Sequence, residues 1–192
     1  MKDLLLLSLN AILIENVILV KCIGICPFLG VAKKTSTACG MGLAVLFVVT
    51  FSSFVTWLFQ HWVLAPLGLE YLQTVAFILI IASLVQLTEM VLKRFMPPLY
   101  EALGIYLPLI TTNCAVLYAA LNGARDMGSL FSATVNGFMT AAGFLLALLL
   151  FNGVHQRLQQ CEFPPSLKGV PAELISAGLL SMAFMGFQGF SL

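Results

Sequence analysis

Charged side chains are scarce in this sequence. Asp, Glu, Lys and Arg together make up 9% of its 192 residues, whereas a soluble globular domain has about 25%. Hydrophobic residues make up 60%, and the formal net charge of +1 argues against a nucleic-acid partner. The composition therefore predicts an integral membrane protein that contacts the lipid bilayer and forms a single membrane domain over residues 1–192.

The sequence also lacks the motifs by which redox proteins bind nucleotides and haem. It contains no G-x-G-x-x-G after a strand, no Walker A motif and no C-x-x-C-H. The two histidines, His61 and His155, lie at the ends of apolar segments, and we expect an interfacial position for both. We therefore expect that the chain does not itself bind NAD.

Six apolar segments are long enough to cross a bilayer as helices, which takes about 20 residues each. The first lacks an A-x-A-like cleavage site, so we interpret it as a retained span and not as a signal peptide. The predicted fold class is all-α integral membrane, with six transmembrane helices at about residues 4–25, 38–60, 71–92, 99–121, 129–154 and 171–191.

The basic residues predict how these spans are oriented, because cytoplasmic loops are enriched in Lys and Arg. The termini and the second and fourth loops hold only Lys2 and Arg125. The first, third and fifth loops hold Lys33, Lys34, Lys93, Arg94, Arg157 and Lys168. We predict a multi-pass protein of the cell inner membrane with both termini on the non-cytoplasmic, periplasmic side.

Three spans followed by three more indicate an internal duplication. A shift of 97 residues aligns Asn16 with Asn113, Gly40 with Gly137 and Phe47 with Phe144. Because three is an odd number, the second half enters the membrane from the opposite side. We therefore predict a 3+3 inverted-topology repeat, a common arrangement in transport proteins, with repeat one at about 1–97 and repeat two at about 98–192.

The first and fourth spans are predicted to be broken helices. The first apolar segment, residues 4–32, is long for one crossing and contains Pro27, which removes a backbone donor and clashes with the preceding turn. Cys26, which precedes the proline, is expected to be extended. The fourth span contains Pro108 and a polar run at 111–113. Broken backbone at membrane depth must be buried in protein or line a cavity, so we expect one site where the breaks meet.

The cysteines offer chemistry at these breaks. Of five, only Cys26 and Cys114 lie against a predicted break; Cys22, Cys39 and Cys161 are interpreted as small apolar residues. A disulfide between Cys26 and Cys114 is one alternative, although buried or cytoplasm-facing cysteines are usually reduced. Thiolates suit an iron–sulfur cluster or a soft metal ion. A [2Fe–2S] cluster takes four ligands, so the residues alone indicate half a site.

Several stretches carry a resemblance to a known family. They are "CPFLGVAKK", "QLTEM", "LGIYLPLITTNCAVL", "PPSLKG" and "SAGLLSMAFMGFQG", in this order along nearly the whole chain. The sequence resembles the A subunits (RnfA) of Rnf ion-translocating electron-transport complexes. It is similar, more distantly, to the E subunits (NqrE) of sodium-pumping NADH:quinone reductases.

The resemblance implies a function. Such complexes pass electrons between ferredoxin and NAD and couple this transfer to sodium or proton transport, so the chain is expected to be a non-autonomous translocase subunit. It implies a homologous six-helix partner of opposite orientation (RnfE-like), and other subunits that carry flavins and iron–sulfur clusters. It also implies an intramembrane [2Fe–2S] cluster held by two cysteines of each chain. In this sequence those cysteines are Cys26 and Cys114, which are not equivalent under the 97-residue shift.

Polar residues within the spans are further candidates, because intramembrane polar groups are often functional. For an ion path, or for support of the cluster ligands, they are Glu89, Asn16, Asn113 and Thr112. Glu89 alternatively pairs with Lys93 one turn later, and the two asparagines alternatively satisfy broken backbone. Lys21 either reaches the interface or offsets the negative charge of a cluster, and Glu15 is a candidate to pair with a partner chain.

Two other classes of function stay open on the residues alone. One is a stand-alone inverted-repeat transporter in which the cysteines are incidental. The other is a structural membrane scaffold. Within the family, an NqrE-type subunit of a quinone reductase is the alternative.

Overall fold

The computed structural model of the chain describes residues 16–27, 35–68, 70–95, 109–110, 112–126, 129–160 and 169–186. Every regular element within these ranges is helical. Three described helices are long and apolar enough to cross a membrane: Thr35–Leu64, Gln73–Val91 and Leu130–Leu158. They coincide with the predicted second, third and fifth spans. Two shorter apolar helices, Cys114–Ala124 and Val170–Met185, overlap the predicted fourth and sixth spans, and residues 4–15 of the first lie outside the described ranges.

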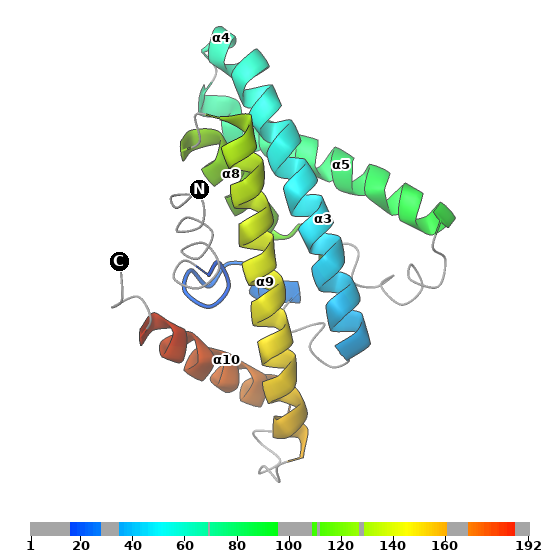
Figure 1. Cartoon of the computed structure of the whole chain (residues 1–192), viewed down its shortest axis with the longest axis vertical. Coiled ribbons are helices and arrows are strands. Elements are labelled where there is room, and N and C mark those ends of the chain that lie inside the picture. The colour runs from blue at the N-terminus through cyan, green and yellow to red at the C-terminus, as the bar shows by residue number, and fades with distance from the viewer. Residues whose placement is uncertain are drawn as a thin grey trace.

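Two long helices form the centre of the structure. Helix α3 (Thr35–Phe59) and helix α9 (Leu130–Gln159) run antiparallel and in contact along much of their length (Figure 1). Small residues permit the close approach, since a Cβ at Gly42 would meet Leu145 and one at Gly137 would meet Ser53. Helix α3 continues through a π-helical turn (Gln60–Leu64) and α4 (Ala65–Leu67), and then ends at Gly68 in the left-handed conformation.

The remaining helices pack around this pair. Helix α5 (Gln73–Phe95) follows a 3-10 turn (Glu70–Leu72) and extends to one side, whereas α10 (Val170–Met185) extends to the other (Figure 1). Helix α8 (Cys114–Asp126) packs against α3, α5 and α9. Buried threonine hydroxyls within the long helices donate to the carbonyl four residues earlier, as Thr56 does to Ser52, so that they are satisfied without water.

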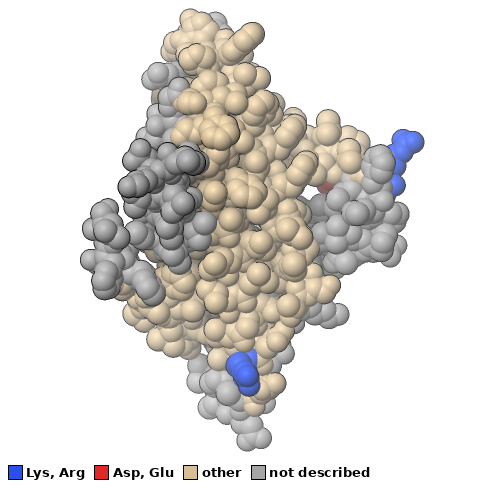
Figure 2. Space-filling model, in the orientation of Figure 1, with Lys and Arg blue, Asp and Glu red and all other residues tan. Residues whose placement is uncertain are grey.

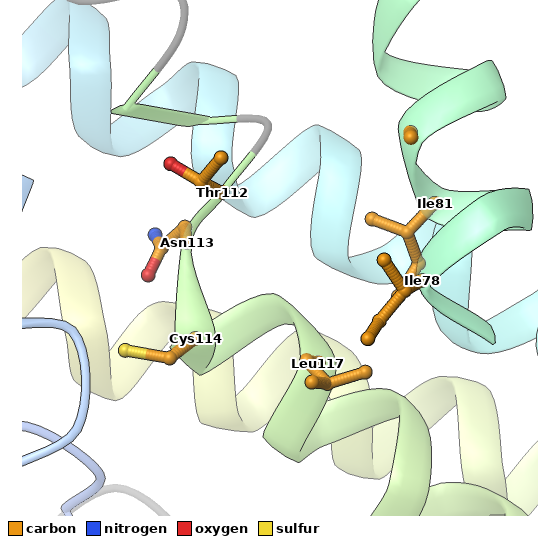
Figure 3. Close-up of a pocket in the computed structure, with 7 residues that line it drawn as sticks. Ile78, Ile81, Thr112, Asn113, Cys114 and Leu117 are labelled. Atoms are coloured by element: carbon orange, nitrogen blue, oxygen red, sulfur yellow. The ribbon is translucent and has the colours of Figure 1, made fainter. Parts of the chain in front are cut away.

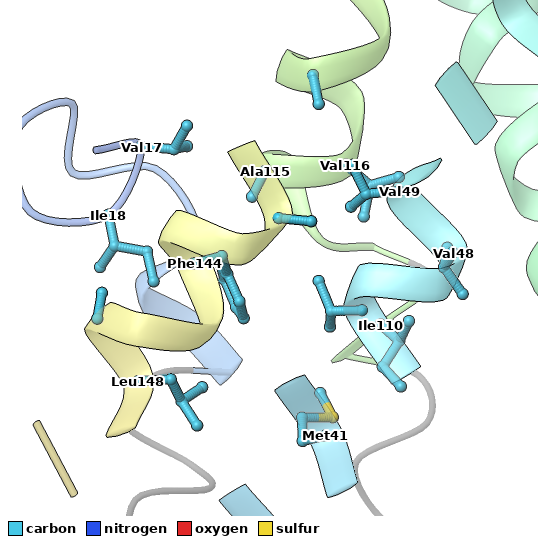
Figure 4. Close-up of a cluster of buried hydrophobic side chains, with 14 of the residues drawn as sticks. Val17, Ile18, Met41, Val48, Val49, Ile110, Ala115, Val116, Phe144 and Leu148 are labelled. Atoms are coloured by element: carbon cyan, nitrogen blue, oxygen red, sulfur yellow. The ribbon is translucent and has the colours of Figure 1, made fainter. Parts of the chain in front are cut away.

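The apolar core joins the broken segments to the central pair. Val17 and Ile18 of the first segment and Ala115 and Val116 of α8 lie on either side of Phe144 in α9, and all five side chains are at most 4% exposed (Figure 4). Met41, Val48 and Val49 of α3 complete the same cluster. The two breaks are therefore held by the best-buried part of the molecule.

The outer surface is mostly apolar. On the face shown in Figure 2, basic side chains appear at the far end of α5 and near the end of α9, where Lys93, Arg94 and Arg157 lie in the last turns. Between them the described surface carries large exposed hydrophobic side chains, which need lipid or another protein as neighbours. On α5 and α10 they include Val75, Ile78, Leu79, Leu87, Met90, Leu174, Ile175, Leu179 and Met182.

One expectation from the sequence is wrong in its details. The first helix breaks at Cys22–Gly24, ahead of Pro27, and residues 25–27 are already helical, so Cys26 is not extended. Proline fits the first turn of a helix, where its missing N–H would have no intrahelical partner, so Pro27 follows the break and does not make it. Near the end of α9, His155 is 5% exposed, packs on Phe151, and its Nδ1 lies 3.7 Å from Oε1 of Glu173 on α10. Its position at the membrane interface stays a prediction.

The close approach of α3 and α9 gives a test of packing. We expect Gly137→Ala to lower the free energy of unfolding by about 1–3 kcal/mol, because the new methyl group would lie 2.8 Å from Cβ of the buried Ser53. Gly153→Ala on the same helix meets nothing within 4 Å and should be neutral or stabilising. The thermal denaturation midpoint in detergent measures both. Ser53→Gly should rescue Gly137→Ala, and equal destabilisation by the two alanines would contradict this packing.

Candidate functional site where two helix breaks meet

The first break is a change of backbone direction between two buried segments. Residues 17–21 form a turn, Cys22 and Gly24 then adopt positive φ angles of 55° and 88°, and helical structure resumes at residue 25. Gly24 is required for two reasons. A side chain strains this backbone, and a Cβ there would lie 3.2 Å from Ala115 Cβ and 3.3 Å from both Asn113 Oδ1 and Phe144 Cε2.

Asn16 satisfies the backbone at the start of this turn. Its Oδ1 accepts hydrogen bonds from the N–H groups of Ile18 (3.2 Å) and Leu19 (3.3 Å). Its Nδ2 donates to the Gly143 carbonyl on α9 at 3.0 Å. The side chain is fully buried, so it replaces water for three backbone groups at once. Ser181 of α10 adds a fourth contact by donating its hydroxyl to the Leu19 carbonyl.

Asn113 likewise satisfies a backbone group at the second break. Residues 109–110 are helical, Thr112 lies in a turn and Cys114 is the first residue of α8. Asn113 Oδ1 accepts a hydrogen bond from the Ala115 N–H at 3.0 Å, which is the role of an N-cap residue. Both asparagines thus satisfy broken backbone, which is one of the two roles that the sequence suggested. The Asn113 side chain is 4% exposed, and its Nδ2 has no hydrogen-bond partner among the residues that the structure describes.

The two breaks contact one another directly. The Gly24 N–H donates a hydrogen bond to Cys114 Sγ at 3.1 Å. The Lys21 ammonium group donates to the Tyr118 hydroxyl and lies 4.7 Å from the centroid of the same ring. Tyr118 follows Cys114 by one helical turn and shares its face of α8. An N–H donor of the first break therefore contacts the cysteine of the second break, and Lys21 contacts the tyrosine one turn further along α8.

This contact also brings the two predicted ligand cysteines into one region. Gly24 precedes Cys26 by two residues, which span at most about 7 Å of chain. Both thiols are exposed on this chain and neither is in a disulfide, so the disulfide alternative is not formed. Cys22 and Cys39 are also exposed free thiols, whereas Cys161 lies outside the described residues. Within the described part of the chain, no three His, Cys, Asp or Glu side chains are grouped for a metal ion.

A cavity of about 310 Å³ lies between α5 and the second break (Figure 3). Its wall is mostly apolar: Ile78, Ile81 and Ala82 come from α5 and Leu117 from α8, while Thr112, Asn113 and Cys114 complete it. The Cys114 sulfur points away from Ile78 and Ile81, as does the Asn113 amide (Figure 3). The polar atoms of the break therefore gather on the side opposite the apolar wall.

The other predicted residues lie apart from this centre. Thr112 is exposed and lines the cavity. Glu89 is half-buried on α5, seven residues beyond Ala82, which is about 10 Å along a helix. It therefore does not share the surroundings of Cys114. Glu15 lies outside the described residues.

The match to known proteins extends over the whole chain. A family model described as "Rnf-Nqr subunit, membrane protein" matches residues 4–191. The chain belongs to this Rnf-Nqr family. The three helices that could cross a membrane, found among the described residues, agree with membership of a membrane-protein family.

Curated members of the family are similar over their full length. The chain is 52% identical over 189 residues to the A subunit of the ion-translocating oxidoreductase complex of Syntrophotalea carbinolica, covering 98% of each protein. It is 50% identical, with the same coverage, to the A subunit of the Na(+)-translocating ferredoxin:NAD(+) oxidoreductase complex of Acetobacterium woodii. It is 48% identical over 191 residues to the corresponding A subunit of an Azoarcus species, covering 100% of this chain and 99% of the relative.

Sequence reasoning missed two members of this Rnf-Nqr site. Gly24 is the donor to Cys114, and its position between Cys22 and Cys26 was the available signal, because glycine beside a suspected ligand indicates close backbone approach. Tyr118 accepts a hydrogen bond from Lys21. The available signal was their separation of 97 residues, which equals the shift that aligns the two predicted repeats.

The two asparagines predict different responses to serine, which also caps helices but has no amide. We expect Asn113→Ala to cost about 1 kcal/mol of stability and Asn113→Ser to restore it, because only the cap oxygen has a partner there. Asn16→Ser should restore Asn16→Ala only in part, because the bond from Nδ2 to Gly143 stays lost. Thermal denaturation of the chain in detergent measures the four variants. If serine and alanine were equally damaging at position 113, the capping role would be wrong.

Proposed function

We propose that the chain is a non-autonomous subunit of an Rnf-type ion-translocating oxidoreductase, which couples electron transfer between ferredoxin and NAD to sodium or proton transport. The observation that carries the proposal is about 50% identity, over 98% of both chains, to proteins named as the A subunits of such complexes. The relative from Acetobacterium woodii is named as part of a ferredoxin:NAD(+) oxidoreductase. That name favours the Rnf function over a quinone-reductase subunit of the NqrE type.

Within this complex, Cys26 and Cys114 are the two ligands that this chain gives to an intramembrane [2Fe–2S] cluster. The residues present fit such a group. The thiols are soft ligands exposed at the surface of the chain. Cys114 Sγ already accepts a hydrogen bond from an N–H group, as cluster sulfurs do. When bound, the cluster supplies one-electron transfer within the membrane.

A homologous six-helix subunit of opposite orientation (RnfE-like) supplies the other two cysteines, and further subunits carry the flavins and remaining clusters. Two features support a partner at this surface. Both cysteines face out from the chain. The described faces of α5 and α10 expose large hydrophobic side chains, which a membrane-embedded partner or lipid would cover.

The proposal includes a 3+3 inverted repeat, and four observations support it. Helices α3 and α9, which occupy equivalent places in the two halves, run antiparallel at the centre. Helices α5 and α10 leave this pair on opposite sides (Figure 1). Asn16 and Asn113 cap equivalent turns. Lys21 meets Tyr118, its equivalent under the 97-residue shift.

The orientation gives a first test. We expect both termini on the periplasmic side of the inner membrane, because six of the eight basic residues outside the spans lie in loops one, three and five. A reporter that is active only outside the cytoplasm should be active when fused at Leu192 and inactive when fused in the loop after Arg94. The reverse pattern would require the opposite orientation.

The cluster gives a second test. Cys26→Ser or Cys114→Ser should remove the [2Fe–2S] signal from the purified complex, because a hydroxyl does not replace a soft thiolate. Electron transfer between ferredoxin and NAD should then stop, while reduction of flavins by NADH at the soluble subunits persists. Electron paramagnetic resonance of the reduced complex and steady-state assays measure the two effects.

Cys22→Ser and Cys39→Ser are matched controls, since both thiols are also exposed on this chain and both variants should keep signal and turnover. If the [2Fe–2S] signal were lost in Cys22→Ser or retained in Cys26→Ser, the ligand would be Cys22 and not Cys26. Full activity of both Cys26→Ala and Cys114→Ala would favour a structural scaffold. Ion transport by the chain alone in liposomes would favour a stand-alone transporter.

A further inference from the structure

The hydrogen bond from Gly24 to Cys114 joins a donor on one break to a ligand on the other. We propose that the Gly24 N–H is a fixed donor that raises the reduction potential of the [2Fe–2S] cluster bound through Cys114. This inference rests on the proposed function and deepens it. It makes Gly24 a positioning residue of the cluster, although it contributes no side chain.

The physical reason is the charge that the cluster gains on reduction. A donor 3.1 Å from the cysteine sulfur withdraws electron density from it, and the reduced state has one more negative charge to stabilise than the oxidised state. Hydrogen bonds to the sulfurs are among the factors that set the potentials of iron–sulfur clusters. The potential should therefore fall when this bond is lengthened.

The packing around the first break holds this donor in place. The neighbouring N–H groups are already used: those of Ile18 and Leu19 donate to Asn16 Oδ1, and that of Ile23 donates to the Val17 carbonyl at 3.0 Å. Gly24 itself is buried, and its Cα is packed against Ala115, Asn113 and Phe144. The N–H therefore points at the sulfur as a result of the packing between the two breaks.

The experiment uses the whole complex with Gly24→Ala. A methyl group at position 24 would lie 3.2–3.3 Å from three neighbours on α8, the second break and α9, and must push the two breaks apart. Gly169→Ala is the matched control: Gly169 has a φ of 96°, so alanine strains the backbone similarly, but its Cβ meets nothing within 4 Å. Alanine strains the backbone in both variants, but only Gly24→Ala disturbs the hydrogen bond to Cys114.

The first measurement is the midpoint potential of the cluster, titrated with mediators and followed by paramagnetic resonance. We expect Gly24→Ala to shift the ratio of oxidised to reduced cluster at a fixed potential about tenfold toward the oxidised form. For a one-electron couple this is about 59 mV more negative. Gly169→Ala should leave the midpoint unchanged. Ala115→Val, which presses on Gly24 from α8 without changing residue 24, should shift it in the same direction.

The second measurement identifies the donor. In complex labelled with ¹⁵N-glycine, the spin of the reduced cluster should show a hyperfine coupling to a glycine nitrogen through the N–H···S bond. Gly24→Ala removes this label and should abolish that coupling, whereas Gly169→Ala should retain it. A cluster that depends on Cys114 but whose potential and glycine coupling survive Gly24→Ala overturns this inference and leaves the proposed function standing. A complex with no Cys114-dependent cluster overturns both.

Discussion

The bilayer interior offers no water to a broken helix, and most of this structure follows from that constraint. Each polar backbone group left without an intrahelical partner at membrane depth costs several kcal/mol unless the protein satisfies it. At the first break, Asn16 satisfies three such groups and Ser181 reaches a fourth. At the second break, Asn113 satisfies the start of α8. The Gly24 N–H uses the sulfur of Cys114 in place of an oxygen acceptor.

The same constraint explains why the breaks lie where they do. A segment with so many long-range hydrogen bonds needs neighbours held in register, and the central pair α3 and α9 provides them through close packing at Gly42 and Gly137. Phe144, fully buried between the two breaks, fixes their separation (Figure 4). The cysteines themselves are exposed, so the structure buries the support of the site and leaves its thiols at the surface. This is the arrangement that a ligand set shared with a second protein requires.

Sequence patterns predicted the larger features because those depend on composition. The second, third and fifth spans follow from runs of apolar residues, and breaks in the first and fourth spans were predicted from Pro27, Pro108 and the polar run at 111–113. The position of the first break was not predictable from Pro27, because proline in the first turn of a helix is favourable, and a glycine with positive φ makes the turn instead. The contact between His155 and Glu173 joins two helices, so it was not predictable from the local sequence. Contacts such as Gly24 with Cys114 depend on tertiary packing between residues 90 apart, which no local pattern encodes.

The proposed inverted repeat is symmetric in its framework and asymmetric in its chemistry. Asn16 and Asn113 cap equivalent turns, yet the amide of Asn16 is bound to α9 while that of Asn113 has no partner. Phe144 is buried at the centre, whereas Phe47, its equivalent under the 97-residue shift, is 58% exposed. The shift also places Val17 opposite Cys114. These differences are consistent with two proposed ligand cysteines at positions that the proposed repeat does not relate. Once the central helices hold the two breaks in contact, the first break supplies the N–H donor and the second break supplies the cysteine sulfur. Only the backbone that brings them together needs to retain the symmetry.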